Sequence, residues 1–162
     1  MKLKVESTFD VAPEVVWATF DSEAFHAQLA AETGMKRTVV EEREEDGIHI
    51  QTTEVRRSKN LPRIAAKVLG SSQLTYIQTN RFDAAKNRLD WRVEIPAMGD
   101  RLQVSGVTSL KPTPTGCQRV LEGDITVRVR MVGAAVEKAI GGEFQKTAVR
   151  AVEIVKEILR AG

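Results

Sequence analysis

The chain has 162 residues, a length that fits one domain with its own hydrophobic core. Its 24 basic and 22 acidic residues leave a formal net charge of +2, which argues against a nucleic-acid-binding protein with a clustered basic surface. One cysteine excludes an intramolecular disulfide, and no apolar run approaches the roughly 20 residues that cross a bilayer. Because the N-terminal residues also lack the apolar core of a signal peptide, we expect a soluble, cytoplasmic protein with a single domain over residues 1–162.

The first third of the chain is predicted to contain a strand and two short helices. Charged and apolar residues alternate over residues 2–9, as in a strand with one buried face. Pro13 suits the first position of a helix, where its missing N–H costs nothing. Ser22 can cap a second helix, and Gly34 ends the helical pair.

The middle of the chain reads as strands with one helical interruption. Residues 37–45 and 48–57 flank Asp46-Gly47, a pair typical of a two-residue hairpin turn. Pro62–Leu69 fits a short amphipathic helix, which either packs as a connector or acts as a lid over a cavity. Further strands are predicted at residues 73–83, 88–95, 102–110 and 118–130. Short turns between neighbours indicate an antiparallel meander.

The last thirty residues predict one long amphipathic helix from Met131 to Ala161. At 1.5 Å per residue it would be roughly 45 Å long, more than the diameter of a small domain. Such a stripe needs a large partner surface, so we predict an α+β fold in which a curved antiparallel sheet wraps around this helix. The buried stripe is predicted to comprise Val132, Val136, Ile140, Phe144, Ala148, Val152, Val155 and Leu159.

Two segments resemble the START-like (SRPBCC, helix-grip) superfamily. The first is Ala12-Pro13-Glu14-Val15-Val16-Trp17, followed by Phe20-Asp21, after the opening strand. The second is the run Val127 to Glu137, which is similar to a branch of unknown function related to polyketide cyclases and lipid-transport proteins. The resemblance implies a seven-stranded sheet gripping the C-terminal helix and a cavity between them for a lipid, sterol or polyketide-like molecule.

The residues themselves also favour a hollow interior. Aromatic residues make up only 5% of the chain, so few bulky rings are available to fill the space between sheet and helix. Gly141 and Gly142 lie inside the predicted helix, where each costs about 1 kcal/mol relative to Ala. They either permit close backbone packing or remove volume that would face the cavity.

The inventory for catalysis is small. The two histidines, His26 and His49, lie on different elements without metal-ligand spacing, and Cys117 has no histidine nearby in sequence. Nucleotide-binding and hydrolase glycine motifs are absent. We therefore predict no catalytic residue, no metal site and no cofactor.

Polar residues on an inward strand face are better candidates for contacting a ligand. Tyr76 and Gln78 share a face with Leu74 and Phe82, so both polar groups would turn inward and need partners. A mostly apolar pocket with a few placed polar groups is typical of small-molecule sites. The candidate ligand-binding residues are Tyr76, Gln78, Trp91, Met98, Val136, Ile140 and Phe144.

These features predict a protein that binds or carries a hydrophobic small molecule without covalent catalysis. One alternative is a cyclase or dehydratase, which would need His49, Tyr76 or Glu94 inside the cavity as an acid or base. The other is a protein-interaction module, which would show an exposed apolar patch of several hundred Å².

Overall fold

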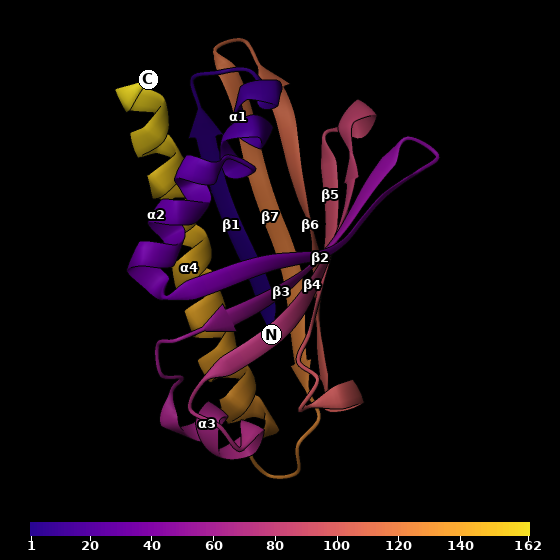
Figure 1. The fold of residues 1–162 in the computed structure, drawn as a ribbon, viewed down its shortest axis with the longest axis vertical. Coiled ribbons are helices and arrows are strands. Elements are labelled where there is room, and N and C mark those ends of the chain that lie inside the picture. The colour runs from indigo at the N-terminus through magenta and orange to yellow at the C-terminus, as the bar shows by residue number, and fades with distance from the viewer.

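The computed structural model describes residues 1–162 and contains a seven-stranded sheet with four α-helices (Figure 1). The elements are β1 (Lys2–Phe9), α1 (Pro13–Phe20), α2 (Glu23–Thr33), β2 (Met35–Glu45), β3 (Ile48–Arg57), α3 (Arg63–Leu69), β4 (Leu74–Asp83), β5 (Arg88–Glu94), β6 (Leu102–Thr113), β7 (Gly116–Val127) and α4 (Gly133–Ala161). Two 3₁₀ turns, η1 (Ala84–Lys86) and η2 (Gly99–Arg101), follow β4 and β5.

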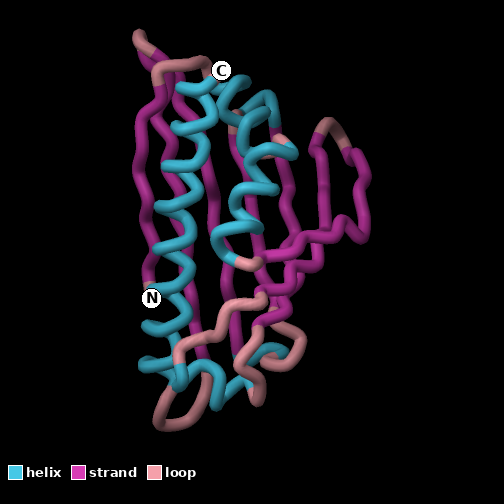
Figure 2. Tube along the Cα trace, turned by 60° about the vertical axis from the view of Figure 1, so that its left-hand side comes forward, coloured by secondary structure: helices cyan, strands magenta, loops and turns pink.

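The sheet order is β1-β7-β6-β5-β4-β3-β2, and every neighbouring pair is antiparallel. The first strand therefore pairs with the last, while α1 and α2 carry the chain across to the opposite edge. Figure 2 shows α4 and α2 side by side along one face of the sheet. This arrangement confirms the predicted α+β helix-grip architecture, with two short helices after the first strand.

The β2–β3 hairpin forms where its turn residues predict it. Asp46 has φ 51° and Gly47 has φ 79°, so both central residues are left-handed. Two such residues are the signature of a type I′ turn, whose twist matches that of the flanking strands.

The hydrophobic core has two parts, one at each end of α4. The first packs β5, β6 and β7 against the N-terminal half of α4 and is centred on Trp91. The second lies beneath α1 and the C-terminal half of α4 and includes Phe9, Phe25 and Ile154. The long helix therefore joins both parts, as its apolar stripe predicts.

Trp91 lies flat against the sheet because the two neighbouring strands β6 and β7 carry glycine beneath it. A Cβ atom on Gly106 would lie 2.4 Å from the indole, and one on Gly123 would lie 2.6 Å from it. The ring also stacks on Phe144 of α4, with centroids 5.3 Å apart. The glycines thus provide the space in which a large aromatic side chain bridges sheet and helix.

The junction between the last strand and α4 differs from its prediction. The strand ends at Val127 rather than residue 130. The Arg128 N–H still donates to the Arg101 carbonyl at 2.7 Å, in register with the Leu102–Val127 pair, but Arg101 belongs to η2 and β6 offers no partner beyond it. Met131 then adopts φ 71°, and α4 begins at Gly133. The expected continuous run from strand to helix is therefore a loop.

The glycine pair inside α4 has two different environments. A Cβ atom on Gly141 would lie 2.3 Å from the Met1 sulfur, so this glycine permits close packing. Gly142 faces open space, with nothing within 4 Å of an added Cβ. Neither residue lines the cavity described below, and the close-packing interpretation fits Gly141.

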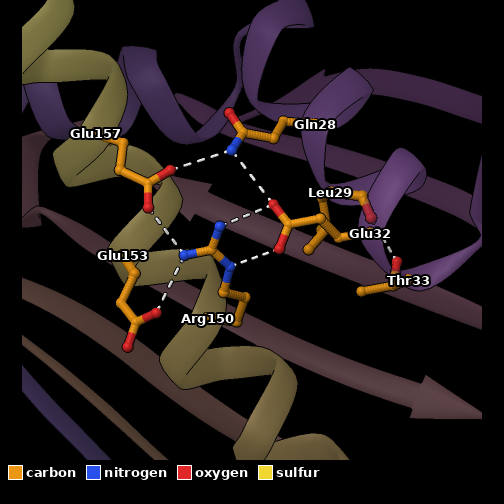
Figure 3. A network of polar contacts seen from close by, with 7 residues as sticks. All are labelled: Gln28, Leu29, Glu32, Thr33, Arg150, Glu153 and Glu157. Carbon is orange, nitrogen blue, oxygen red and sulfur yellow. Dashed lines mark hydrogen bonds and ion pairs between the residues drawn. The ribbon is translucent and has the colours of Figure 1, made fainter.

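One ion-pair network fixes α2 against α4 (Figure 3). Arg150 of α4 donates to Glu32 of α2 through two nitrogens, at 2.6 and 2.9 Å. Its third nitrogen reaches Glu153 at 3.1 Å and Glu157 at 3.0 Å, and Gln28 donates to Glu157. Arg150 therefore links the two helices.

Candidate ligand-binding site

An apolar cavity of about 240 Å³ lies between the concave face of the sheet and α4. Its walls alternate along β5, β6 and β7, because inward-facing residues recur at every second position of a strand. On the helix they recur at three- and four-residue steps. The apolar lining includes Val93, Ile95, Val104, Leu121 and Ile125 from the sheet, and Ile140, Phe144, Ala148 and Ala151 from α4.

Two further hollows adjoin this cavity. One, of about 390 Å³, lies between α1, α2 and the strands, and the other, of about 490 Å³, lies between α2 and strands β2 to β4. Gln78 lines all three spaces, Tyr76 lines the cavity and the second hollow, and Arg119 lines the cavity and the first. The three spaces therefore lie next to one another and share part of their walls.

Tyr76 brings a hydroxyl group into the cavity with almost no protein partner. Its closest polar contact is the Met35 sulfur at 4.0 Å, which is a weak acceptor. Burial raises the pKa of Tyr76 to about 12, so the phenol remains protonated and can donate a hydrogen bond at neutral pH.

Gln78 contributes an amide on the same strand face. Its Nε2 donates to the Asn80 side-chain oxygen Oδ1 at 3.0 Å, which fixes the orientation of the Gln78 side chain. Tyr76 and Gln78 therefore both point inward from β4, as their spacing predicts.

An ion pair closes another part of the wall. The Arg57 guanidinium of β3 donates to the Glu143 carboxylate of α4 at 2.8 Å. The Arg57 side chain is only 10% exposed, and its Nε has no partner in the protein. This contact links the sheet to α4 and neutralises the carboxylate nearest the cavity.

Arg119 is the least expected residue in the site. It lies on β7 between inward-facing Cys117 and Leu121, and the residue is 8% exposed. Its Nε and Nη1 are buried without a hydrogen-bond partner in the protein, and no carboxylate pairs with it. Burial lowers the pKa of Arg119 to about 10, which still leaves the side chain charged at neutral pH.

His26 and Arg37 lie together in the walls of both outer hollows. The Arg37 Nη1 lies 3.0 Å from the His26 Nε2, and Arg37 also donates to Gln51. Burial, with a smaller contribution from the Arg37 charge, lowers the pKa of His26 to about 4. His26 is therefore neutral at pH 7 and accepts the hydrogen bond from Arg37.

The candidate residues predicted from sequence occupy two layers. Tyr76, Gln78, Ile140 and Phe144 line the cavity. Trp91, Met98 and Val136 are buried in the core behind it and do not line it. Met98 turns inward because its N–H donates to the Ile95 carbonyl at 2.9 Å, which folds the loop against the core.

Sequence reasoning missed Arg119, although a signal was present. Residues 117, 119 and 121 share one face of the strand, and two of the three are apolar. A single arginine in an otherwise inward-facing set is the kind of buried polar residue that needs an explanation.

The other titratable candidates do not line the cavity itself. His49 lines the adjoining hollow of about 390 Å³ and pairs with Glu44 at 2.6 Å and Glu42 at 3.0 Å, and the Glu44 hydrogen bond in particular raises the pKa of His49. Glu94 is exposed on β5. No group of three or more His, Cys, Asp or Glu side chains is arranged to hold a metal ion. No helix combines the length and hydrophobicity needed to cross a membrane.

Several solved structures share this fold at low sequence identity. TTHA0849 from Thermus thermophilus is 13% identical, with a TM-score of 0.70 over 100% of this chain and 99% of that one. The di-domain ARO/CYC StfQ from the steffimycin biosynthetic pathway is 10% identical, with a TM-score of 0.70 over 99% of this chain and 51% of its own. Ara h 8.0201 is 14% identical, with a TM-score of 0.63 over 99% and 98% of the two chains.

These similarities show the START-like helix-grip fold that the opening motif and the closing helix predict. No curated protein sequence matches the chain. Residues 4–159 match the family described as "Protein of unknown function (DUF2505)". Because this match spans nearly the whole sequence, the chain belongs to the DUF2505 family.

Proposed function

We propose that this protein binds or carries a hydrophobic small molecule in the cavity between the sheet and α4. The supporting observation is the lining of that cavity, in which apolar side chains from β5, β6, β7 and α4 surround a small set of inward polar groups. Apolar walls supply most of the binding free energy, and a few placed polar groups fix the orientation of the ligand. Tyr76 and Gln78 orient its polar end, and Ile140 and Phe144 contact its apolar part.

Trp91, Val136 and Met98 support this site from behind. Trp91 stacks on Phe144 and so fixes the ring that faces the cavity. Val136 and Met98 are fully buried in the same core cluster. Their role in the proposal is to hold the walls in place rather than to touch the ligand.

The proposal is tested by filling the cavity. Ala148→Phe adds a ring to a lining position, while Val149→Phe adds the same ring at the adjacent position, which is 42% exposed. We expect native mass spectrometry and dye displacement to show binding of apolar probes (fatty acids, sterols and polyketides) to the wild type and to Val149→Phe, and loss of binding in Ala148→Phe. Equal binding by all three proteins, or no binding by the wild type, would overturn the proposal.

The helix α3 is proposed to gate this cavity. Leu61, two residues before α3, lines the cavity, and Ile64 and Val68 pack against the surrounding core. Amide hydrogen exchange at residues 64–69 should slow when a probe binds. Unchanged exchange at saturation would identify α3 as a packed connector.

A cyclase or dehydratase activity is a second candidate, because one neighbour of the same fold is described as an ARO/CYC and Tyr76 is a titratable group inside the cavity. A protonated phenol can act as a proton donor to a bound carbonyl. Turnover of a polyketide-like probe that disappears in Tyr76→Phe, with probe binding retained, would establish this role.

A further inference from the structure

We propose that the ligand carries an oxyanion head group, a carboxylate or phosphate, and that Arg119 binds it inside the cavity. This inference rests on the proposed function, because it specifies the chemical class of the molecule that the cavity accepts. Its starting point is a charged side chain that is 8% exposed and has two nitrogens without a partner in the protein.

A buried charge without a partner is costly, so proteins normally pair it or use it. The polar side chain directly opposite on the neighbouring strand does not satisfy Arg119. Ser7 pairs with Arg119 in the β1–β7 register, yet the Ser7 hydroxyl is itself buried without a partner. Two inward-facing polar groups therefore lie across one strand pair without bonding to each other.

The contact that Arg119 does make leaves its hydrogen-bond donors free. The Arg119 Cζ lies over the Phe20 ring, 4.3 Å from its centroid, in a cation–π contact that needs no hydrogen bond. The Nε and Nη1 donors have no partner in the protein and remain available to oxygen acceptors. The contact with Phe20 also holds the guanidinium in position before any ligand arrives.

The location of Arg119 fits a head-group site. It lines both the apolar cavity and the adjoining hollow beside α1, so it lies at the boundary between them. An amphipathic acid can place its tail among the apolar side chains beneath α4 and its oxygens at this boundary. The Tyr76 hydroxyl and the Gln78 amide line the same cavity and offer further hydrogen-bond donors.

The charges around the cavity do not compensate Arg119. Glu143 lines the same cavity but pairs with Arg57, and Asp21 lines the outer hollow without an ion pair to Arg119. Arg37 also lines this outer hollow and adds a second positive charge there. The local field therefore favours an anion over a neutral or cationic ligand.

The experiment compares probes that share one tail and differ in the head group: dodecanoic acid, dodecyl phosphate and 1-dodecanol. Isothermal titration calorimetry below the micellar concentrations is done on the wild type, Arg119→Met, Arg119→Lys and Arg92→Met. Arg92 is an exposed arginine on β5 and serves as the matched control.

For the wild type and Arg92→Met, we expect at least one of the two anionic probes to bind 10-fold or more tightly than the alcohol. The preferred anion identifies the head group as a carboxylate or a phosphate. In Arg119→Met this preference should fall to about one, with the affinity for the alcohol unchanged or increased. Arg119→Lys keeps the charge but loses the planar fork, so it should retain part of the preference.

The outcomes separate this inference from the proposed function. If the acid, the phosphate and the alcohol bind the wild type equally, the head-group proposal is wrong while the hydrophobic cavity stands. The same conclusion follows if Arg119→Met keeps the full preference for the anion. If no probe binds, both proposals fail.

Discussion

Two neighbouring regions of the space between the sheet and α4 are built differently, although Phe144 contributes to both. In the filled region Trp91 lies in the room left by Gly106 and Gly123 and stacks on Phe144. In the hollow region the walls enclose a cavity, which the charged side chain of Arg119 lines. One sheet and one helix therefore provide both a packed core and a hollow, depending on which side chains face inward.

This contrast separates stability from binding. The filled region makes the packing contacts that hold α4 to the sheet. The hollow region lacks such contacts and contains a desolvated charge, which destabilises the ligand-free protein. Substitutions in the filled region should therefore lower the free energy of unfolding far more than substitutions in the hollow region.

The largest effect is expected for Trp91→Ala. Removing the buried indole leaves a void that the rigid sheet cannot close, so the free energy of unfolding should fall by about 3–5 kcal/mol. Urea denaturation followed by circular dichroism measures the change. If the free energy of unfolding falls by less than about 1 kcal/mol, the packing around Trp91 is not the main contact between α4 and the sheet.

A smaller loss is expected for Gly106→Ala. The new Cβ would lie 2.1 Å from the Glu122 carbonyl oxygen and 2.4 Å from the indole, so the strand or the ring must shift. Overpacking of this kind costs about 1–3 kcal/mol. Gly142→Ala is the control, because nothing lies within 4 Å of its added Cβ and the helix should gain about 0.5–1 kcal/mol. Equal effects of the two substitutions would contradict the packing account.

His26, which lines the two hollows beside the cavity, should make the free energy of unfolding depend on pH. Because the pKa of His26 is lowered from 6.5 to about 4 in the folded state, the unfolded chain binds more protons between these values. Stability is therefore lost as the pH falls from about 6.5 to about 4. The half-buried position limits the loss to about 1–2 kcal/mol.

The measurement is thermal unfolding of the wild type and His26→Gln across this range. The difference between the two proteins should narrow or reverse toward pH 4, because the variant has no group to protonate at this position. A constant difference at every pH would refute the role of His26.

The ion-pair network between α2 and α4 should contribute less to the free energy of unfolding. Arg150→Met removes the link between α2 and α4 and should lower the free energy of unfolding only slightly at low ionic strength, because Arg150 and its partners are partly exposed. The cost should decrease as salt screens the pairs in the wild type. Lys146→Met, at an exposed position on the same helix, is the control. A cost that does not change with salt would point to packing rather than charge.

The smallest loss, or even a gain, is expected at Arg119. Arg119→Met removes the unpartnered charge and keeps a side chain of similar length, so the unfolding free energy of the ligand-free protein should stay within about 1 kcal/mol of the wild type or increase. Denaturation of both ligand-free proteins checks this. If the free energy of unfolding falls by about 3 kcal/mol or more, Arg119 has a structural role. The hollow region would then contribute to stability as the filled region does.

Local sequence signals identified most of the fold. Asp46-Gly47 specifies its hairpin through backbone conformation alone, and the apolar stripe from Val136 to Val155 specifies a buried helix face. The junction at residues 128–132 was less predictable, because β7 loses its partner where β6 begins at Leu102. The end of β7 therefore depends on which strand becomes its neighbour and on where that strand starts.

The site was predictable only in part. Period-two alternation brought Tyr76 and Gln78 to one face of β4, and the same rule applied to β7 would have brought Arg119 inward. Alternation does not reveal whether an inward side chain meets a cavity or the core. Trp91 and Met98 point inward too, yet both are packed behind the cavity.

By itself, the sequence determined the order of elements, their faces and the antiparallel pairing, because these depend on short-range periodicity, turn conformation and the length of the closing helix. Only the tertiary structure decided where the interior is filled and where it is hollow. That outcome depends on how the volumes of residues far apart in the chain add up across the gap, as when Gly106 and Gly123 accommodate Trp91. The surroundings of Arg119 also come from distant parts of the chain, and they leave its Nε and Nη1 without a hydrogen-bond partner in the protein.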